Sequence, residues 1–378
     1  MIEGDIAFAL LLCLSFALFS KKFNFPPVPM YMLGGIAIGV SGLNIVHESG
    51  VSNFLTHLGL LFLLFMMGLE LNPSGFSGKK RNLFFSGLTD LGVNILIGFA
   101  ASVLLGFPLY EAFVIAAAFY ISSSAMAVSS LIENRKLSSP ESETILWLMV
   151  FEDIMLLFII VAFSAASANP AKILLSAAFV IAFFFIAVRL LGSKIRVLLE
   201  RDDDIPLLFT FTAVIAAAGI SGILGIPDTL TAIALGSALS STNPEMLEKH
   251  AKPFRDVFLI LFFVFFGISV DLTDGFPVIP VVILALLAIA SKLLSSMAIG
   301  MFVHKNPYSG IEVWSETTAR GEFSLAIASM YGTPLITTTV AMIVLITSFT
   351  GGFMGRYSYR IKRFFREKRR AKQDILSA

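Results

Sequence analysis

The chain has 378 residues, of which 57% are hydrophobic and 14% are charged, and its mean hydropathy is +0.87. A soluble domain needs polar residues to cover its surface, so this composition excludes a soluble globular protein and predicts an all-α polytopic membrane protein. The formal net charge is only +1, and no nucleic-acid partner is expected. The single cysteine, Cys13, excludes an intrachain disulfide and a cysteine-rich metal site.

Thirteen apolar stretches follow one another along the chain, and each is predicted to be a transmembrane helix. The first is not interpreted as a signal peptide, because residues 1–5 are acidic and no small-residue cleavage site follows. Several stretches are interrupted by Gly or Pro, which membrane helices tolerate when neighbours satisfy the freed backbone groups. The predicted spans are 5–20, 28–46, 54–72, 83–106, 110–132, 144–168, 171–193, 205–224, 227–243, 255–273, 277–303, 310–331 and 334–354.

Lys and Arg residues predict the orientation of these spans. Alternate loops and the C-terminal tail hold 23 of the 27 cationic residues, whereas the opposite loops hold one, Lys172. By the positive-inside rule, the N-terminus is predicted outside and the C-terminus in the cytoplasm, which also favours an odd number of spans. The predicted location is the cell membrane, inner or plasma, as a multi-pass protein. The remaining three cationic residues lie within spans: Arg189, Lys292 and Arg320.

The chain also repeats itself at an offset of 201 residues. The offset brings Pro26 onto Pro227, Gly35 onto Gly236, and Glu70-Leu71 onto Asp271-Leu272. Seven spans separate the copies, so the two halves are predicted to be inverted in the membrane, which is a transporter architecture. Within one membrane domain, 1–378, the predicted parts are a first repeat 1–168, a linker helix 169–200, a second repeat 201–355, and a basic tail 356–378 lying against anionic lipid.

The stretch 144–168 carries two adjacent carboxylates, Glu152 and Asp153, near its middle. A charge at that depth costs roughly 2.5–3.5 kcal/mol on insertion scales, so it usually marks an ion or proton pathway. On a helix the two side chains point about 100° apart, so both cannot face one cavity. We expect Asp153 to face the ion path and Glu152 to face a neighbouring helix, although the sequence does not fix which.

Lys292 is predicted to be the partner of this pair. It lies in the middle of the span 277–303, too deep for its ammonium group to reach the surface. A buried ammonium group needs a carboxylate or must lose its proton. Either the pair is purely structural, or its pairing changes as the site loads and unloads.

Two spans, 110–132 and 310–331, contain unusually polar segments at matching positions of the two halves. The first holds Ser122, Ser123 and Ser124, and the second holds Arg320, Gly321 and Glu322. Such spans indicate broken helices whose exposed carbonyls and helix ends bind a cation. The three serines could equally serve ordinary helix packing, in which small residues let neighbouring helices approach closely. For Arg320 and Glu322, the favoured role is structural: their charges neutralise the helix dipoles in the broken region.

Five motifs resemble those of the second monovalent cation:proton antiporter family, which includes Kef-type and NapA-type exchangers. They are FMMGLEL at 65–71, SSSA at 122–125, FED at 151–153, FGISVDL at 266–272 and RGEF at 320–323. The resemblance covers essentially the whole membrane region. It implies a NhaA-like inverted repeat in which the fourth to sixth and eleventh to thirteenth spans form a core. The fifth and twelfth spans are discontinuous and cross, and the other domain usually forms a homodimer.

The resemblance also implies roles for individual residues. Asp153 would bind the cation or the proton, and Lys292 would pair with the acid before it. Sodium-exchanging relatives often carry Asp at that preceding position and Kef-like ones often Gln, so Glu152 departs from both. Kef-type proteins continue into a cytoplasmic nucleotide-binding domain, whereas this sequence ends at Ala378, so it lacks that domain or represents part of a longer protein.

The resulting hypothesis is antiport of Na⁺ or K⁺ against protons, without a cofactor. A proton and a dehydrated cation compete for Asp153, and the metal ion is held by its oxygens together with Ser123, Ser124 and nearby carbonyls. The loaded core then slides past the dimer domain in an elevator-like movement. If Glu152 or Lys292 also exchanges a proton, transport is electrogenic; if neither does, it is electroneutral.

Other functions stay open from the sequence. Within transport they are an ion-coupled symporter of the same fold, a glutathione-regulated-type potassium efflux system lacking its regulatory domain, and a gated potassium channel. An intramembrane aspartyl protease needs two aspartates facing one water. It is disfavoured because Asp90 is placed nearer a span start, leaving Asp153 alone at mid-depth. No histidine lies at membrane depth, which disfavours zinc and serine hydrolases, and no enzyme activity is expected.

Overall fold

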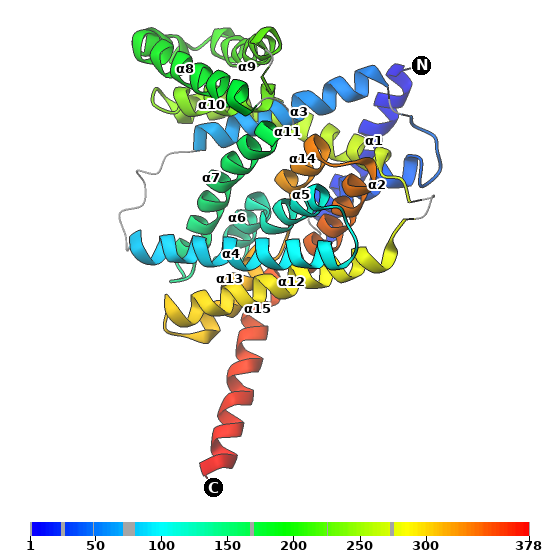
Figure 1. The fold of residues 1–378 in the computed structure, drawn as a ribbon, viewed down its shortest axis with the longest axis vertical. Helices are drawn as coiled ribbons and strands as arrows, with labels where there is room; N and C mark the ends of the chain where they lie inside the picture. Colours follow the sequence, from blue (N-terminus) through cyan, green and yellow to red (C-terminus); the bar gives the residue numbers. More distant parts are fainter. Residues whose placement is uncertain are drawn as a thin grey trace. The chain divides into compact units, whose positions relative to one another are not determined.

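The computed structural model describes residues 2–23, 27–47, 49–70, 80–166, 170–224, 226–272 and 276–377. Regular structure in these ranges is α-helical throughout (Figure 1). The helices are α1 (Ile2–Phe23), α2 (Pro27–Ile38), α3 (Gly50–Glu70), α4 (Lys80–Leu104), α5 (Leu109–Tyr120), α6 (Ser124–Glu133), α7 (Ser142–Ala166), α8 (Pro170–Leu199), α9 (Ile205–Leu224), α10 (Asp228–Leu239), α11 (Pro244–Ser269), α12 (Val278–Phe302), α13 (Pro307–Thr317), α14 (Glu322–Tyr331) and α15 (Pro334–Ser377).

The described helices agree with a membrane protein but do not test the number of crossings. Eight helical stretches are long and apolar enough to cross a bilayer. Two predicted spans are each divided into two short helices, α5 with α6 and α13 with α14, so fifteen helices stand where thirteen spans were predicted. Pro26 and Leu71, which entered the repeat comparison, lie outside the described residues, as do 167 and 168 at the end of the acidic stretch.

The chain divides into two compact units. Unit 1 comprises 1–14, 31–77 and 153–269, and unit 2 comprises 15–30, 78–152 and 270–378. The boundary falls within α7, between Glu152 and Asp153.

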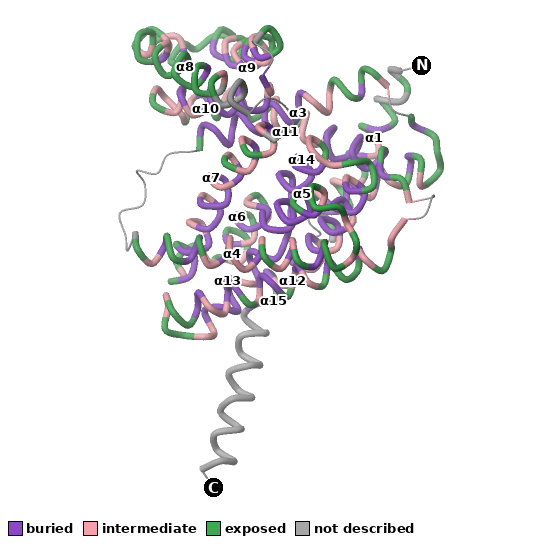
Figure 2. Tube along the Cα trace, viewed as in Figure 1, coloured by how far each residue is buried: buried purple, intermediate pink, exposed green. Residues whose placement is uncertain are grey.

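In unit 1, α3 packs along both α10 and α11, and glycines set how closely these helices approach. A Cβ placed on Gly68 would lie 3.0 Å from the Gly236 Cα, and one placed on Gly35 would lie 2.9 Å from the Gly267 Cα. There is no room for a side chain at either crossing. The packed part of α3, from Leu58 to Leu69, is buried accordingly, whereas much of α8 and α9 is exposed (Figure 2).

Gly68→Val should therefore destabilise unit 1. The added atoms meet the backbone of α10, including the Ser237 nitrogen 2.9 Å from the Cβ position, and backbone atoms cannot move aside. Overpacking of this kind costs about 1–3 kcal/mol or more, measurable as a lower thermal unfolding midpoint in detergent micelles. Gly219→Ala on α9 is the matched control, because its Cβ would meet nothing within 4 Å. An unchanged midpoint for Gly68→Val would contradict this close packing.

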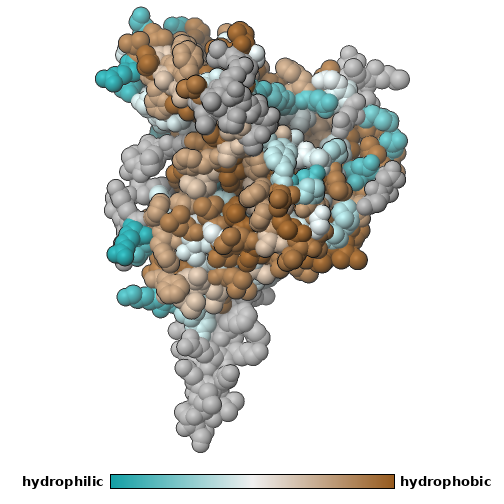
Figure 3. Space-filling view, viewed as in Figure 1, coloured by the Kyte–Doolittle hydropathy of each residue, from teal (hydrophilic) through white to brown (hydrophobic). Residues whose placement is uncertain are grey.

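In unit 2, α12 packs against α4, α13 and α15, while α5 packs against α4, α14 and α15. The outer faces of α4 and α12 carry exposed apolar side chains, including Leu96, Leu104, Ile279 and Leu286. The surface over these helices is correspondingly hydrophobic (Figure 3). Exposed aliphatic faces of this kind suit contact with lipid. The short helices α5 and α14 are mostly buried (Figure 2), so unit 2 encloses the two interrupted stretches.

Candidate functional site

Two breaks in unit 2 lie directly against each other. The first follows α5, where Ile121 is extended and Ser123 caps the start of α6 by accepting a hydrogen bond from the Met126 nitrogen. The second separates α13 from α14. The Ser123 nitrogen donates to the Ala319 carbonyl at 2.8 Å, and the Ser324 hydroxyl donates to the Ile121 carbonyl at 3.1 Å. Each broken segment thus satisfies backbone groups that the other leaves free.

Gly321 permits this contact through its small size. A Cβ at this position would lie 2.6 Å from both Cβ and Oγ of Ser123. Its φ of −146° is extended backbone that any residue can adopt, so the requirement for glycine is one of space. The two breaks could not lie so close with a larger residue here.

Arg320 is fully buried, and its guanidinium group binds backbone carbonyls at the ends of two half-helices. It donates to the carbonyls of Phe119 (2.6 Å), Thr317 (3.2 Å), Thr318 (3.0 Å) and, on α12, Ala288 (3.3 Å). Phe119 and Thr317 are at the C-terminal ends of α5 and α13, where the helix dipole is negative. The positive charge of Arg320 therefore stabilises both of these ends.

Glu322 complements Arg320 at the opposite helix ends. It is the first residue of α14, and its Oε2 lies 3.3 Å from the hydroxyl of Ser123, the residue that caps α6. A carboxylate is favoured at a helix N-terminus, where the dipole is positive. The predicted neutralising role is divided between them: Arg320 binds carbonyls at C-terminal ends, and Glu322 lies at N-terminal ends.

Substitution of Arg320 should separate the effect of its charge from that of its forked shape. Arg320→Met leaves four buried carbonyls without this donor, and each unsatisfied group costs about 1–3 kcal/mol. Arg320→Lys keeps the charge but has three donors on one atom, which cannot reach all four. We expect the thermal unfolding midpoint to be highest for the wild type, lower for Arg320→Lys and lowest for Arg320→Met. Equal midpoints for the two variants would show that the charge contributes nothing, whereas an Arg320→Lys midpoint equal to that of the wild type would show that charge alone matters.

Lys292 is the centre of a buried ion network. Its Nζ lies 2.6 Å from Asp90 Oδ2 and 2.8 Å from Glu152 Oε1, and the three side chains are at most 2% exposed. The ammonium group also lies 5.5 Å from the centre of the Tyr120 ring. The predicted pairing of Lys292 with Glu152 is confirmed, but Lys292 has a second carboxylate partner that was not predicted.

Glu152 is held from the first break as well. Both the backbone nitrogen and the hydroxyl of Ser122 bond to its carboxylate, the hydroxyl at 3.0 Å. The same hydroxyl lies 2.9 Å from the Thr317 carbonyl at the second break. Ser122 thus connects Glu152 to the crossing. Sequence analysis placed Ser122 in the polar run but did not identify it as a site residue.

Asp90, which was placed nearer a span start and given no role in the site, belongs to the buried network. It lies in the interior of α4, is 1% exposed, and accepts hydrogen bonds from Ser295 (2.7 Å) and Asn94 (2.9 Å) besides its contact with Lys292. Ser291 in turn donates to the Asn94 amide oxygen at 2.7 Å. The available signal was the spacing of polar residues: Asp90 and Asn94, like Ser291 and Ser295, are four apart, and such residues share a helix face.

The contacts described above do not test the predicted ion-binding roles of Asp153, Ser123 and Ser124. Asp153 is 7% exposed and belongs to unit 1, so its assignment as the ion carrier stays a prediction. Ser124 is the half-buried first residue of α6. Ser123 bonds to Glu322, so its predicted role as a cation ligand also stays untested.

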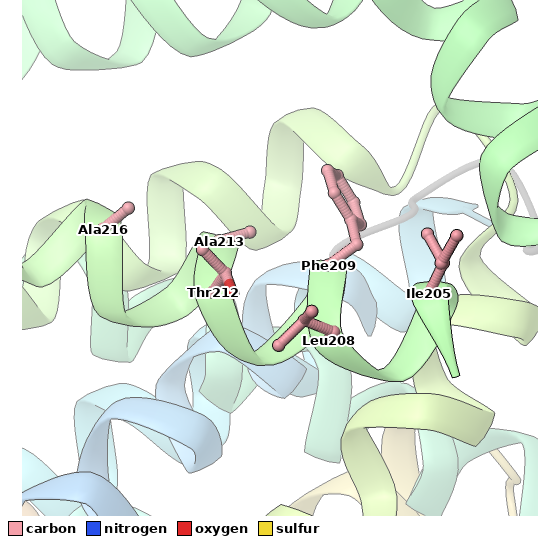
Figure 4. Close-up of a pocket in the computed structure, with 6 residues that line it drawn as sticks. All are labelled: Ile205, Leu208, Phe209, Thr212, Ala213 and Ala216. Carbon is pink, nitrogen blue, oxygen red and sulfur yellow. The ribbon is translucent and has the colours of Figure 1, made fainter.

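An apolar groove on α9 can be set aside as the ion site. It has a volume of about 290 Å³ and is lined by Ile205, Leu208, Phe209, Thr212, Ala213 and Ala216, all on one helix (Figure 4). Only Thr212 has a side-chain oxygen there. A dehydrated cation needs several oxygen ligands, which this groove does not supply.

The Asp90–Lys292–Glu152 network has two features suited to proton or cation chemistry. Two carboxylates and one ammonium group carry a formal charge of −1, and all three are removed from water. A buried unbalanced charge is costly, and the buried guanidinium group of Arg320, which interacts electrostatically with Glu152 and Asp90, offsets it. Through Ser122, the network is connected to the paired breaks, where backbone carbonyls are free of helical hydrogen bonds.

Comparisons with known proteins agree with this geometry. The family model described as "Sodium/hydrogen exchanger, transmembrane" matches residues 7–356. The chain is 27% identical to the K⁺/H⁺ antiporter subunit KhtU of Bacillus subtilis, over 99% of this chain and 98% of the relative. It is also 27% identical to the ammonium/H⁺ antiporter subunit AmhT of Alkalihalophilus pseudofirmus, over 82% and 81%.

A solved structure shows a similar fold. The sodium proton antiporter MjNhaP1 of Methanocaldococcus jannaschii superposes with a TM-score of 0.67 at 16% identity, covering 96% of this chain and 98% of that one. The resemblance to cation:proton antiporters is confirmed by these matches. The chain belongs to the transmembrane sodium/hydrogen exchanger family, whose members exchange cations for protons and are not enzymes.

Proposed function

We propose that the protein exchanges Na⁺ or K⁺ for protons, with Asp153 as the carboxylate that binds either the cation or the proton. The observation that carries the proposal is the buried Asp90–Lys292–Glu152 network, bonded through Ser122 to two crossing helix breaks. Asp153 follows Glu152 directly on α7 and is itself buried. Charges at such depth are retained where ions or protons move.

In this proposal, sharing of Lys292 lets Glu152 change its charge. An ammonium group with one partner would be left buried and unpaired when that partner takes up a proton, which is strongly unfavourable. Lys292 also contacts Asp90 at 2.6 Å, so it keeps a charged partner when Glu152 is neutral. Glu152 is therefore the candidate for a second transported proton, and its behaviour decides whether exchange is electrogenic.

Contacts within each unit support the inverted repeat that we propose. The offset of 201 relates Gly35 to Gly236, and each of them closely approaches another glycine, Gly267 and Gly68 respectively, which are 199 residues apart. In unit 2, Asn94 hydrogen-bonds Ser295, a residue exactly one offset away, at 3.4 Å. Contact between equivalent positions is expected where a two-fold axis relates two halves. The proposal further includes thirteen spans, a cytoplasmic C-terminus, a homodimer in the cell membrane, and elevator-like alternating access.

The test is reconstitution of the full chain into liposomes that contain a pH-sensitive dye. Pulses of Na⁺, K⁺ and Li⁺ should each be compared with an impermeant organic cation at equal ionic strength. A transported cation drives protons in the opposite direction, and the order of the responses identifies the substrate. The name of one relative, an ammonium/H⁺ antiporter subunit, adds ammonium to the cations worth comparing. Absence of proton movement with every cation would refute the proposed exchange.

A further inference from the structure

Unit 2 contains a second buried charged cluster, which we call the Lys136 cage. Lys136 follows α6, and its ammonium group is surrounded by oxygens from α13 and α15. The Nζ atom lies 2.5 Å from Glu316 Oε1, 2.8 Å from Glu312 Oε1, 2.6 Å from Ser358 Oγ and 2.7 Å from the Gly355 carbonyl. The exposed side-chain fractions of Lys136, Glu312 and Glu316 are only 14%, 8% and 0%.

The oxygens of this cage exceed the hydrogen-bonding capacity of one lysine. The three donors of Lys136 are used on Glu316, Gly355 and Ser358, which leaves Glu312 in ionic contact and bonded by the Ser358 hydroxyl at 3.0 Å. Four oxygens around one point match the demands of a spherical cation better than those of a three-donor group. Carbonyl and carboxylate oxygens are the ligands that replace the hydration shell of such cations.

The charge of the cage is also unbalanced. Glu312 and Glu316 together carry two negative charges against the single positive charge of Lys136. The second oxygen of Glu316 is buried and accepts no hydrogen bond of good geometry, although the Ser130 hydroxyl is close to it. A merely structural ion pair would be expected to satisfy both oxygens, because a buried unpaired polar atom is costly.

We propose that the Lys136 cage is a second binding site for a monovalent cation of the ammonium and potassium class, which the protein's own Lys136 occupies in this structure. A free cation that enters displaces the ammonium group and releases the α6–α7 connection from α13 and α15. The site is separate from the Lys292 network, although Glu316 immediately precedes Thr317, whose carbonyl binds Arg320.

The experiment empties the cage by substitution and asks whether a cation refills it. Full-length Asp153→Asn protein serves as the background, so that the site proposed for transport does not contribute. Lys136→Ala is added, and the thermal unfolding midpoint in detergent micelles is followed against ammonium, potassium or magnesium chloride. N-methylglucamine chloride at equal ionic strength is the reference. Lys194→Ala, at an exposed position of α8, is the matched control.

We expect the Lys136→Ala protein to unfold at a lower temperature in N-methylglucamine, and ammonium or potassium to raise its midpoint in a saturable way. The background and the Lys194→Ala control should respond only at much higher concentrations, because the cation must first displace Lys136 there. Adding Glu316→Gln to Lys136→Ala should remove the rise. If Lys136→Ala does not fold, Lys136→Met keeps the side-chain stem and rubidium binding is measured directly. No cation-specific rise or rubidium binding, or a response to magnesium alone, would overturn the proposal. Because the background is not expected to transport, this outcome is independent of the proposed exchange.

Discussion

Replacing Lys292 by methionine is expected to be among the most destabilising single changes in unit 2. Methionine preserves the length of the side chain but removes the only positive charge that contacts Asp90 and Glu152 in the described network. Two buried carboxylates would then lack a positive charge in direct contact, and only the electrostatic interaction with Arg320 would remain. Removal of one partner of a buried ion pair costs about 3–5 kcal/mol. Thermal or denaturant unfolding of the purified protein in micelles measures this loss.

Neutralising the carboxylates should restore much of the lost stability. Asp90→Asn with Glu152→Gln keeps the shapes of both side chains while removing the charges that Lys292 balances. Adding these two changes to Lys292→Met should raise the unfolding midpoint well above that of Lys292→Met alone. Lys194→Met, at an exposed position, controls for loss of a lysine. If the triple variant were no more stable than Lys292→Met, electrostatic balance would not be the reason for the effect.

Asp153→Asn is expected to reduce cation-driven proton movement in liposomes to the level of protein-free vesicles. Asparagine is nearly the same size but can neither release a proton nor offer a negative charge to a cation. The fold should survive, because an amide at a buried site costs much less than a stranded charge. The unfolding midpoint of Asp153→Asn should therefore lie close to that of the wild type. Retained transport would remove Asp153 from the mechanism.

Two further Asp→Asn variants, at Asp90 and Asp203, show whether the loss of transport is specific to Asp153. Asp90→Asn removes one negative charge from the network and leaves Asp153 in place. It should therefore slow exchange or shift its pH dependence without abolishing it. Asp203 lies outside the spans, where hydrogen bonding to Arg201 holds the pKa of Asp203 below its ordinary value. It stays ionised until the pH falls through that lowered pKa, so Asp203→Asn should leave the pH profile near neutrality unchanged. Abolished transport in this control would indicate a general defect.

Local sequence was sufficient for the features that depend on one segment. The apolar spans, the polar interruptions near 121–123 and 318–321, and the isolated charge of Lys292 could all be predicted, because composition and helix breaking act over short distances. The Lys292–Glu152 pair followed from the cost of burying an ammonium group without a carboxylate. These predictions needed no knowledge of which helices are neighbours.

Tertiary packing alone decided the remaining partners. Asp90 lies 202 residues from Lys292, and Lys136 lies 180 residues from Glu316, so neither contact leaves a local signature. Arg320 could be predicted to neutralise a broken helix, but not to bind the carbonyls of α5, α12 and α13. The sequence by itself determined where charge is buried in the apolar spans. The packing of helices determined which groups balance it, because a buried charge is stabilised only by partners that the fold brings within contact distance.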